Sequence, residues 1–161
     1  VSMGFTLSDR KVSVSNVVYN QAKTDFAAGD LAWDSDDIRV GLLTGASVPV
    51  GALDPDLDTV SALLAVSGTV ECAATNYVRK TTASRTATKD NANNRVNLDF
   101  ANITWTALGG ASNETVRAVF VYKEGASDAA RRLISVHEIT ATPTNGGDFT
   151  VNTPNDVIRM S

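Results

Sequence analysis

Arg95-Val-Asn-Leu-Asp-Phe100 is the stretch that decides the fold, because its apolar side chains alternate strictly with polar ones. A period of two is typical of a β-strand that buries one face. Asn93-Asn94 precedes the stretch, and further clusters of Asn, Gly or Pro separate the apolar segments that follow it. Such clusters are typical of reversals between antiparallel strands. The C-terminal half, from residue 91 to residue 160, therefore predicts a succession of strands and turns.

Other segments show the same strand character. Val116-Arg-Ala-Val-Phe-Val-Tyr122 is apolar on both faces at its centre, which favours a central strand. Leu133-Ile-Ser-Val-His-Glu-Ile139 resembles it. Nearer the front, apolar residues alternate over 38–42, where Gly41 indicates close packing or a bulge. Further strands are expected over 69–74 and 77–88 (as two strands or one broken strand), 103–105, 142–151 and 157–160.

The segment ahead of the first strand predicts a helix from about residue 16 to residue 28. Ser15-Asn16 can cap its start, and Gly29 supplies a natural stop. Residues 57–66 predict a second, short helix. Carboxylates interact favourably with the start of a helix, and three are available there: Asp54, Asp56 and Asp58.

Together these elements predict a mainly β protein: an antiparallel β-sandwich, jelly-roll-like or a related barrel, with one N-terminal helix. Residues 16–161 form a single domain, and residues 1–15, which lack a sustained period, form an extended N-terminal arm. Pro154 is expected to interrupt strand pairing or to mark an edge. The side chains expected to be largely buried are Ile38, Val40, Val96, Leu98, Phe100, Trp105, Phe120 and Val136.

Composition narrows the class of protein. The chain has 161 residues, of which 43% are hydrophobic, which is enough for one domain with its own core. No apolar run approaches the roughly 20 residues of a membrane helix. The net charge of −4 gives no support to nucleic-acid binding. Cys72 is the only cysteine, which excludes an internal disulfide and a cysteine zinc cluster. We therefore expect no nucleic-acid and no membrane partner.

Charged residues are unevenly distributed along the chain. Between residues 30 and 58, seven aspartates accompany a single cation, Arg39. Between residues 79 and 95, five cations accompany a single carboxylate, Asp90. The two groups are either solvated faces or complementary surfaces that meet between copies of the chain or on a charged partner. The sequence leaves both interpretations open.

His137 is the only histidine, so any catalytic triad or dyad has to include it. Ser135 lies two residues away and shares its face of the strand, whereas Glu138 points to the opposite face. A Ser–His pair without an orienting acid or a nucleophile turn is a weak signal for catalysis. We therefore expect a protein that is not an enzyme, with no catalytic residues and no cofactor.

Asp54-Pro-Asp-Leu-Asp58 resembles the opening of an EF-hand calcium loop. Thr59 stands where that loop needs glycine for its turn, and Ala65 stands where it needs a bidentate glutamate. The pattern is therefore better explained as solvated aspartates at a helix start. We expect no metal site of EF-hand type, and a weak cation site is left open.

Four segments carry a likeness to known proteins: Ile38-Arg-Val-Gly-Leu-Leu43 after a helix, Asn91 to Trp105 with its N-N-R-V…F…I-T-W run, Val119-Phe-Val-Tyr-Lys123, and Pro143-Thr-Asn-Gly-Gly-Asp-Phe-Thr-Val151. Together they resemble a family of small virion structural proteins of tailed bacteriophages. The resemblance spans about residues 16–161 and consists of strand-and-turn patterns. It therefore implies a fold and a virion setting, and it carries no catalytic residues.

The resemblance implies a structural role. Its leading form is a capsid cement or decoration protein that binds the shell of major capsid protein, as a homo-oligomer or symmetric array on the particle. A tail or neck component is the alternative. A carbohydrate-binding module of a tail fibre is third, since it would need exposed aromatic residues. Aromatic residues make up only 6% of the chain, and Trp33, Trp105 and Tyr122 are scattered along it.

The arm supplies the candidate partner-binding residues. Val1, Met3, Phe5 and Leu7 are spaced two apart, as an added strand would present them to a neighbour. An arm with so little periodic apolar surface does not fold alone, so we expect it to become ordered on binding. These four side chains should carry most of the affinity, while exposed charges, worth about 0–1 kcal/mol per pair, help to set register.

Overall fold

The computed structural model describes residues 17–153 and 157–160. The expected arm (1–15), its candidates Val1, Met3, Phe5 and Leu7, and the cap at Ser15-Asn16 lie outside the described residues. The helices are α1 (Asn20–Ala28), the 3₁₀ helix η2 (Val50–Leu53) and α2 (Val60–Ala65). The strands are β1 (Val17–Val18), β2 (Ile38–Thr44), β3 (Val70–Glu71), β4 (Lys80–Thr81), β5 (Thr86–Asp90), β6 (Arg95–Asp99), β7 (Ile103–Leu108), β8 (Thr115–Lys123), β9 (Arg132–Pro143), β10 (Gly147–Val151) and β11 (Ile158–Met160).

A six-stranded antiparallel sheet forms the middle of the molecule. Its order is β1-β9-β8-β2-β3, and β4 is a further partner of β2. β8 lies between β9 and β2 along almost its whole length. The prediction that residues 116–122 form a central strand is therefore confirmed.

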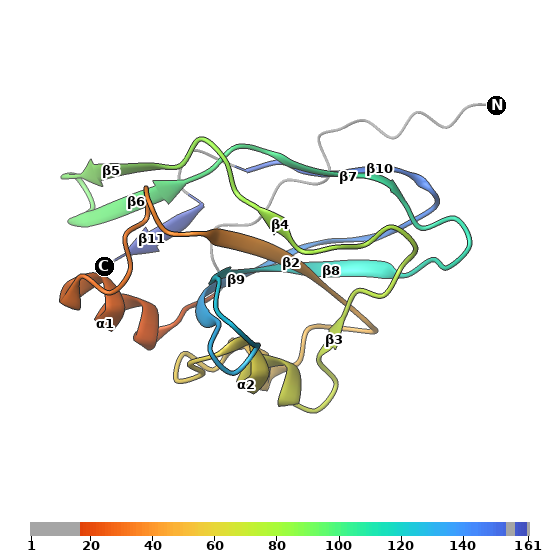
Figure 1. Cartoon of the computed structure of the whole chain (residues 1–161), viewed down its shortest axis with the longest axis horizontal. Helices are drawn as coiled ribbons and strands as arrows, with labels where there is room; N and C mark the ends of the chain where they lie inside the picture. Colours follow the sequence, from red (N-terminus) through yellow and green to blue (C-terminus); the bar gives the residue numbers. More distant parts are fainter. Residues whose placement is uncertain (1–16, 154–156, 161) are drawn as a thin grey trace.

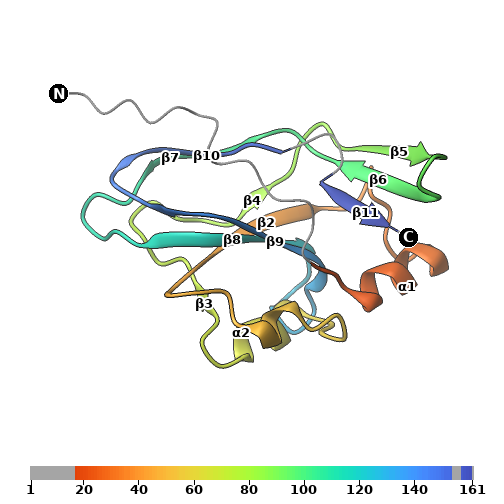
Figure 2. The same cartoon turned by 180° about the vertical axis from the view of Figure 1, so that it is seen from behind.

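A second layer of strands covers one face of this sheet (Figure 1). It consists of the three-stranded sheet β11-β6-β5 and the pair β10-β7, and these pairings are also antiparallel. The helix α2 lies on the opposite side of the six-stranded sheet, as the view from behind also shows (Figure 2). The result is the predicted antiparallel sandwich, and its sheets do not close into a barrel.

Two apolar clusters follow from this arrangement, and β8 contributes to both of them. Val119 and Val121 belong to the cluster that includes Trp105 in the second layer. Phe120, on the other face of β8, belongs to the cluster that includes Leu63 of α2. Both faces of β8 are therefore covered, which explains why this segment is apolar on both faces.

Gly41 is explained by close packing and not by a bulge. It pairs regularly with Phe120 across the β2–β8 ladder, and the register shift of that ladder lies further along, between Leu43 and Thr44. A Cβ atom on Gly41 would occupy the same space as the ring of Phe120. The absence of a side chain on β2 is thus what allows the aromatic ring of β8 to lie against the sheet.

The first helix begins later than predicted. Val17 and Val18 form β1 and pair with Val136 and Ser135 at the edge of β9. β-branched valines suit a strand better than a helix, and the edge of β9 satisfies their backbone hydrogen bonds. The predicted end is confirmed, because Gly29 adopts a left-handed φ of 82° directly after α1.

Tyr19 lies between β1 and α1 and fixes this corner of the chain. Its side chain is wholly buried in the cluster on the α2 side of the sheet. The hydroxyl donates a 2.6 Å hydrogen bond to the carbonyl of Ala52, and the backbone N–H donates to the carbonyl of Ile134 at 3.0 Å. Burial, followed by the charge of Asp54, raises the pKa of the phenol. The chain is therefore anchored in the core directly before α1 begins.

The second helix forms within the predicted range, but a different residue caps it. The side chain of Thr59 accepts a 3.2 Å hydrogen bond from the N–H of Ala62, in the manner of an N-cap. The first turn of α2 contains no acidic residue. Asp58 directly precedes this cap, and its backbone carbonyl accepts a hydrogen bond from Leu133 of β9.

The burial prediction is confirmed for seven of its eight side chains, which are at most 2% exposed, but Val96 is 40% exposed. Val96 lies near the start of β6, which projects beyond the end of β2 (Figures 1 and 2). The main sheet therefore does not cover it, although Leu98 and Phe100 further along the chain are buried. The alternating pattern predicted the correct buried face of β6, but it did not predict how far along β6 the main sheet covers that face.

The segment expected to be broken is broken. Residues 69–88 contain three short strands, β3, β4 and the first part of β5. β10 ends at Val151 and β11 begins at Ile158, and Pro154, the expected interruption or edge position, lies outside the described residues. These interruptions leave β3 and β4 as two short partners on the same edge of β2.

Candidate functional site

Ser135 and His137 meet as the strand geometry predicts, with 2.8 Å between Oγ and Nε2. Both side chains are wholly buried. A substrate cannot reach a Ser–His pair that is sealed inside the protein in this conformation. The pair is therefore best described as an internal polar contact of β9.

The aspartates of residues 54–58 take part in local structure. Asp54 accepts a 3.0 Å hydrogen bond from the N–H of Asp56, whose own carboxylate accepts one of 2.8 Å from Asn20. Among the described residues, no group of three or more His, Cys, Asp or Glu is arranged to hold a metal ion. Cys72 is buried, and this burial raises the pKa of its thiol to about 11, so it is not a reactive thiolate near neutral pH.

The aromatic side chains considered for a sugar platform lie in the core. Trp33, Trp105 and Tyr122 are at most 3% exposed. The indole N–H of each tryptophan donates to a backbone carbonyl. In the part of the chain that the structure describes, the exposed large hydrophobic side chains are all valines: Val50, Val70, Val78 and Val96. The described surface therefore offers no aromatic platform on which a sugar could stack.

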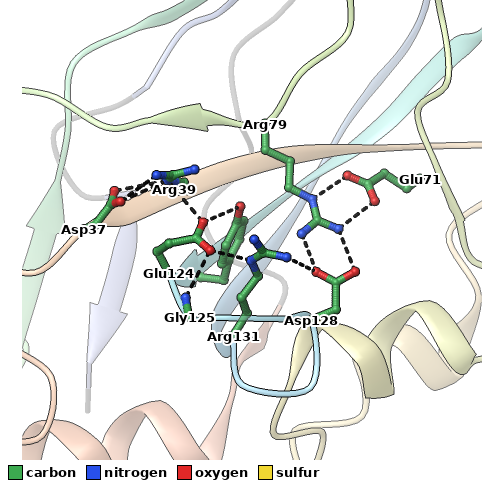
Figure 3. Close-up of polar contacts among 9 residues, drawn as sticks. Asp37, Arg39, Glu71, Arg79, Glu124, Gly125, Asp128 and Arg131 are labelled. Atoms are coloured by element: carbon green, nitrogen blue, oxygen red, sulfur yellow. Dashed lines mark hydrogen bonds and ion pairs between the residues drawn. The ribbon is translucent and has the colours of Figure 1, made fainter.

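Seven charged side chains of alternating sign form a continuous series (Figure 3). They come from the start of β2, from β3, from the residue before β4 and from the β8–β9 loop. We call this series the ion-pair chain. Its members, in order of contact, are Glu71, Arg79, Asp128, Arg131, Glu124, Arg39 and Asp37.

Arg79 is the member that joins the surface charges to the core. Its guanidinium binds Glu71 through two hydrogen bonds of 2.6 and 2.7 Å, and its other edge binds Asp128. The guanidinium carbon also lies 5.5 Å from the ring centroid of Phe120 and 5.4 Å from that of Tyr122, within cation–π range. Only a planar, forked side chain can make all of these contacts together, so lysine could not replace it.

The ion-pair chain keeps its carboxylates ionised. The hydrogen bond from Arg79 lowers the pKa of Asp128, and the hydrogen bond from Arg131 adds to this effect. Partial burial pushes the pKa of Glu124 upward, but the hydrogen bonds and positive charges around it, chiefly from Arg131, outweigh burial and lower the pKa. Carboxylates held in this way are poor general acids or bases near neutral pH.

The β8–β9 loop, residues 124–131, is fastened on two sides. The ion-pair chain ties it to β2 and β3. Its backbone carbonyls at Asp128 and Arg131 each accept a 3.0 Å hydrogen bond from the start of α2, from Ser61 and Val60 respectively. The loop thus links α2, the strands β2 and β3 and the end of β8 through hydrogen bonds and ion pairs.

The predicted charge groups are partly consumed within one subunit. Arg85, from the cationic group, donates to the backbone carbonyls of Trp33 and Asp36 at 2.6 and 2.8 Å. Arg95 pairs with Asp90 at 2.9 Å. With Arg79 in the ion-pair chain, three of the five cations bind inside the molecule. These three cations are therefore engaged within the subunit, whichever of the two interpretations holds for the rest of the charge groups.

Sequence reasoning missed the centre of the ion-pair chain. Arg39, Arg79 and Asp37 were noted only as members of charge groups, and Glu71, Glu124, Asp128 and Arg131 were not singled out. Two contacts have a local signature: Asp128 and Arg131 are three residues apart and pair at 2.8 Å, and Asp37 and Arg39 are two residues apart and pair at 2.7 Å. The contacts of Arg79 with Asp128 and of Arg39 with Glu124 join residues far apart in sequence and have none.

No family model matches this chain, and neither does any curated protein or solved structure. The function of the chain therefore has to be inferred from its residues and their geometry. Within the described residues, no helix is both long and apolar enough to cross a membrane.

Acid should destabilise the protein through the ion-pair chain. Hydrogen bonds from arginines lower the pKa values of Asp128 and Asp37, so the unfolded chain binds protons more tightly than the folded one. Their stabilisation is complete above the ordinary carboxyl pKa of about 4 and is lost as the pH falls through the lowered folded-state values. Urea unfolding measured from about pH 7 to about pH 3 should show this loss.

An Arg79→Met variant separates this effect from general acid unfolding. It should be less stable at neutral pH and should lose less additional stability in acid, because Asp128 and Glu71 no longer have their main counterion. Lys89→Ala, at an exposed position on β5, is the matched loss of a cation and should follow the wild-type curve. Parallel curves for wild type and Arg79→Met would show that the ion-pair chain does not govern the pH dependence.

Proposed function

We propose that this chain is a non-enzymatic structural protein of a phage virion, most specifically a capsid cement or decoration protein bound to the shell of major capsid protein. The observation that carries the proposal is the ion-pair chain. It uses seven charged side chains to tie segments distant in sequence onto a central sheet that is covered on both faces. Charged side chains that are paired within the subunit make it rigid. Rigidity suits a protein that holds the subunits of a shell together.

The virion setting is supported by the strand-and-turn resemblance. Two of the segments that carry it, residues 38–43 and 119–123, form the adjacent strands β2 and β8 at the centre of the sandwich. A third, residues 143–151, contains β10 and pairs with β7. The resembling residues therefore form the framework of the fold, so they point to a shared scaffold whose contacts with partners lie elsewhere.

Those contacts would be made by surfaces that the fold itself does not use. The aromatic residues described above are buried, and the ion-pair chain is internally satisfied. The arm, residues 1–15, would supply apolar side chains at every second position to a groove or strand edge of the neighbouring capsid protein. Copies of the protein would then lie in a symmetric array on the particle.

Binding to particles tests the proposal. Purified full-length protein would be mixed with virions that lack it, and its position located by cryo-electron microscopy. We expect regular density on the outside of the shell, repeated with the capsid symmetry. Density confined to the tail or neck would contradict the capsid role in favour of a tail component. A failure to bind any part of the particle would contradict the virion role.

Deletion of residues 1–10 tests the arm. The truncated protein should remain a folded sandwich with a cooperative melting transition, because the described core begins at Val17. It should no longer attach to particles, since the apolar side chains of the arm are removed. Lys89→Ala serves as a control that should attach normally. Full occupancy by the truncated protein would show that the faces of the sandwich make the contact instead.

A further inference from the structure

A hollow opens between α1 and the projecting end of the β6–β11 sheet. Its volume is about 350 Å³, and apart from Lys23 its lining is apolar. The lining residues are Lys23, Phe26 and Ala27 of α1, Val96 and Leu98 of β6, and Met160 of β11. Small-molecule pockets span roughly 300–1,000 Å³, so this hollow has room for a few side chains and little more.

The hollow lies where the burial prediction failed. Val96 and Met160 are direct cross-strand partners, so their side chains are neighbours in the wall of the hollow. Val96 is 40% exposed although it continues the buried face of Leu98 and Phe100. Its sequence pattern is that of a covered strand, and among the described residues of one subunit the cover is missing. A partner that supplied apolar side chains would complete the pattern.

The N-terminal arm has the matching chemistry. In an extended conformation, Val1, Met3, Phe5 and Leu7 would lie on one side of a segment about 20 Å long. The nine residues from 8 to 16 that join them to β1 can span at most about 30 Å. This length is enough to reach a neighbouring subunit. It leaves the apolar residues free to lie in a hollow lined by side chains of the same kind.

The length of the chain before β1 is compatible with a second copy. β1 begins at Val17 on the edge of β9, and the residues that precede it are numerous enough to reach beyond the subunit.

The area of the contact points the same way. A stable protein interface buries about 1,200–2,000 Å² in total, which is more than a hollow of this size can supply alone. Two copies related by a twofold axis would each give an arm and each receive one, which doubles the contact. We propose that residues 1–7 of a second copy of this chain occupy the hollow formed by α1, β6 and β11. The inference concerns the protein in solution and rests on the proposed function only for its purpose: on a particle the same residues would exchange this contact for the one with the capsid protein.

Self-association in solution tests the inference without particles. Sedimentation equilibrium should show that the full-length protein associates and that deletion of residues 1–10 makes it monomeric. Val96→Asp should weaken association about tenfold or more, because a carboxylate would lie unpaired in an apolar contact. Val70→Asp is the matched control, since Val70 also lies in a strand and is 44% exposed, and it should associate like the wild type.

Complementation gives the sharpest result. Val96→Asp retains the arm but has a damaged hollow, whereas the truncated protein retains the hollow but has no arm. At a protein concentration at which each is monomeric alone, the mixture should form a heterodimer. A labelled peptide of residues 1–10 should bind the truncated protein, and the same peptide with Phe5→Ser and Leu7→Ser should not. The peptide experiment stands even if Val96→Asp fails to fold.

Two results would overturn the inference. One is a full-length protein that stays monomeric while the peptide binds the truncated form, because the arm would then fill the hollow of its own subunit. The other is a truncated protein that neither binds the peptide nor differs from the full-length protein in association. Neither result bears on attachment to particles, so the inference and the proposed function can fail separately.

Discussion

Phe120→Ala is expected to lower the free energy of unfolding by about 3–5 kcal/mol. The ring of Phe120 is wholly buried on β8, stacked at 5.7 Å on the ring of Tyr122 and covered by the guanidinium of Arg79. Its removal would leave a cavity in the middle of the sheet and would take away one of the two rings beneath Arg79. Domains of this kind are typically stable by about 5–15 kcal/mol, so the loss would be a large part of the total.

Urea unfolding at neutral pH measures this loss, and the melting temperature should fall by roughly 10 °C. Val50→Ala is the control, because Val50 is 87% exposed and its truncation should change stability little. A loss of less than about 1 kcal/mol in Phe120→Ala would mean that the cavity collapses or that β8 is not central to the stability of the sandwich.

Gly41→Ala should be the second most damaging single change among those considered, at about 1–3 kcal/mol. The added methyl group would overlap the ring of Phe120. That ring cannot swing aside, because Tyr122 stacks on it and Arg79 covers it. The backbone of β2 cannot yield easily either, since it is hydrogen-bonded to β8 on one side and to β3 and β4 on the other.

A double-mutant cycle isolates the cause. In the Phe120→Ala background the space beside residue 41 is empty, so Gly41→Ala should cost nothing there. It could even stabilise the protein by about 0.4–1 kcal/mol, because alanine restricts the unfolded chain more than glycine does. The two substitutions should therefore be strongly non-additive when urea unfolding is compared for all four proteins. Additive losses would show that glycine at this position is required for another reason.

The elements that could be predicted are those whose pattern is decided locally. β8 was identified as central because apolar residues on both of its faces have no other explanation in a soluble domain. The end of α1 was identified because glycine tolerates the left-handed conformation that ends a helix. The start of α1 was misplaced because Val17 and Val18 have a strand edge available only after β9 has folded beside them.

The site was largely beyond the reach of sequence reasoning. The ion-pair chain brings Arg79 into contact with Asp128, 49 positions later, and no sequence pattern near either residue predicts this contact. Val96 is exposed because β6 projects beyond the first residues of β2. How far the main sheet extends beneath β6 cannot be read from the alternating pattern of β6 itself. Charge groups read along the chain suggested contacts between subunits, whereas Arg79 and Arg85 find their partners within one subunit.

The position of Tyr19 has a mechanical consequence for a protein that is pulled by its N-terminal segment. Tension entering at Val17 would first strain the two residue pairs between β1 and β9. It would next act on Tyr19. Pulling this side chain out of the core requires breaking its hydrogen bond to Ala52 and separating the ring from the side chains packed around it. The buried ring of Tyr19 would therefore resist extraction, and the packed side chains around it would bear the force before α1 does.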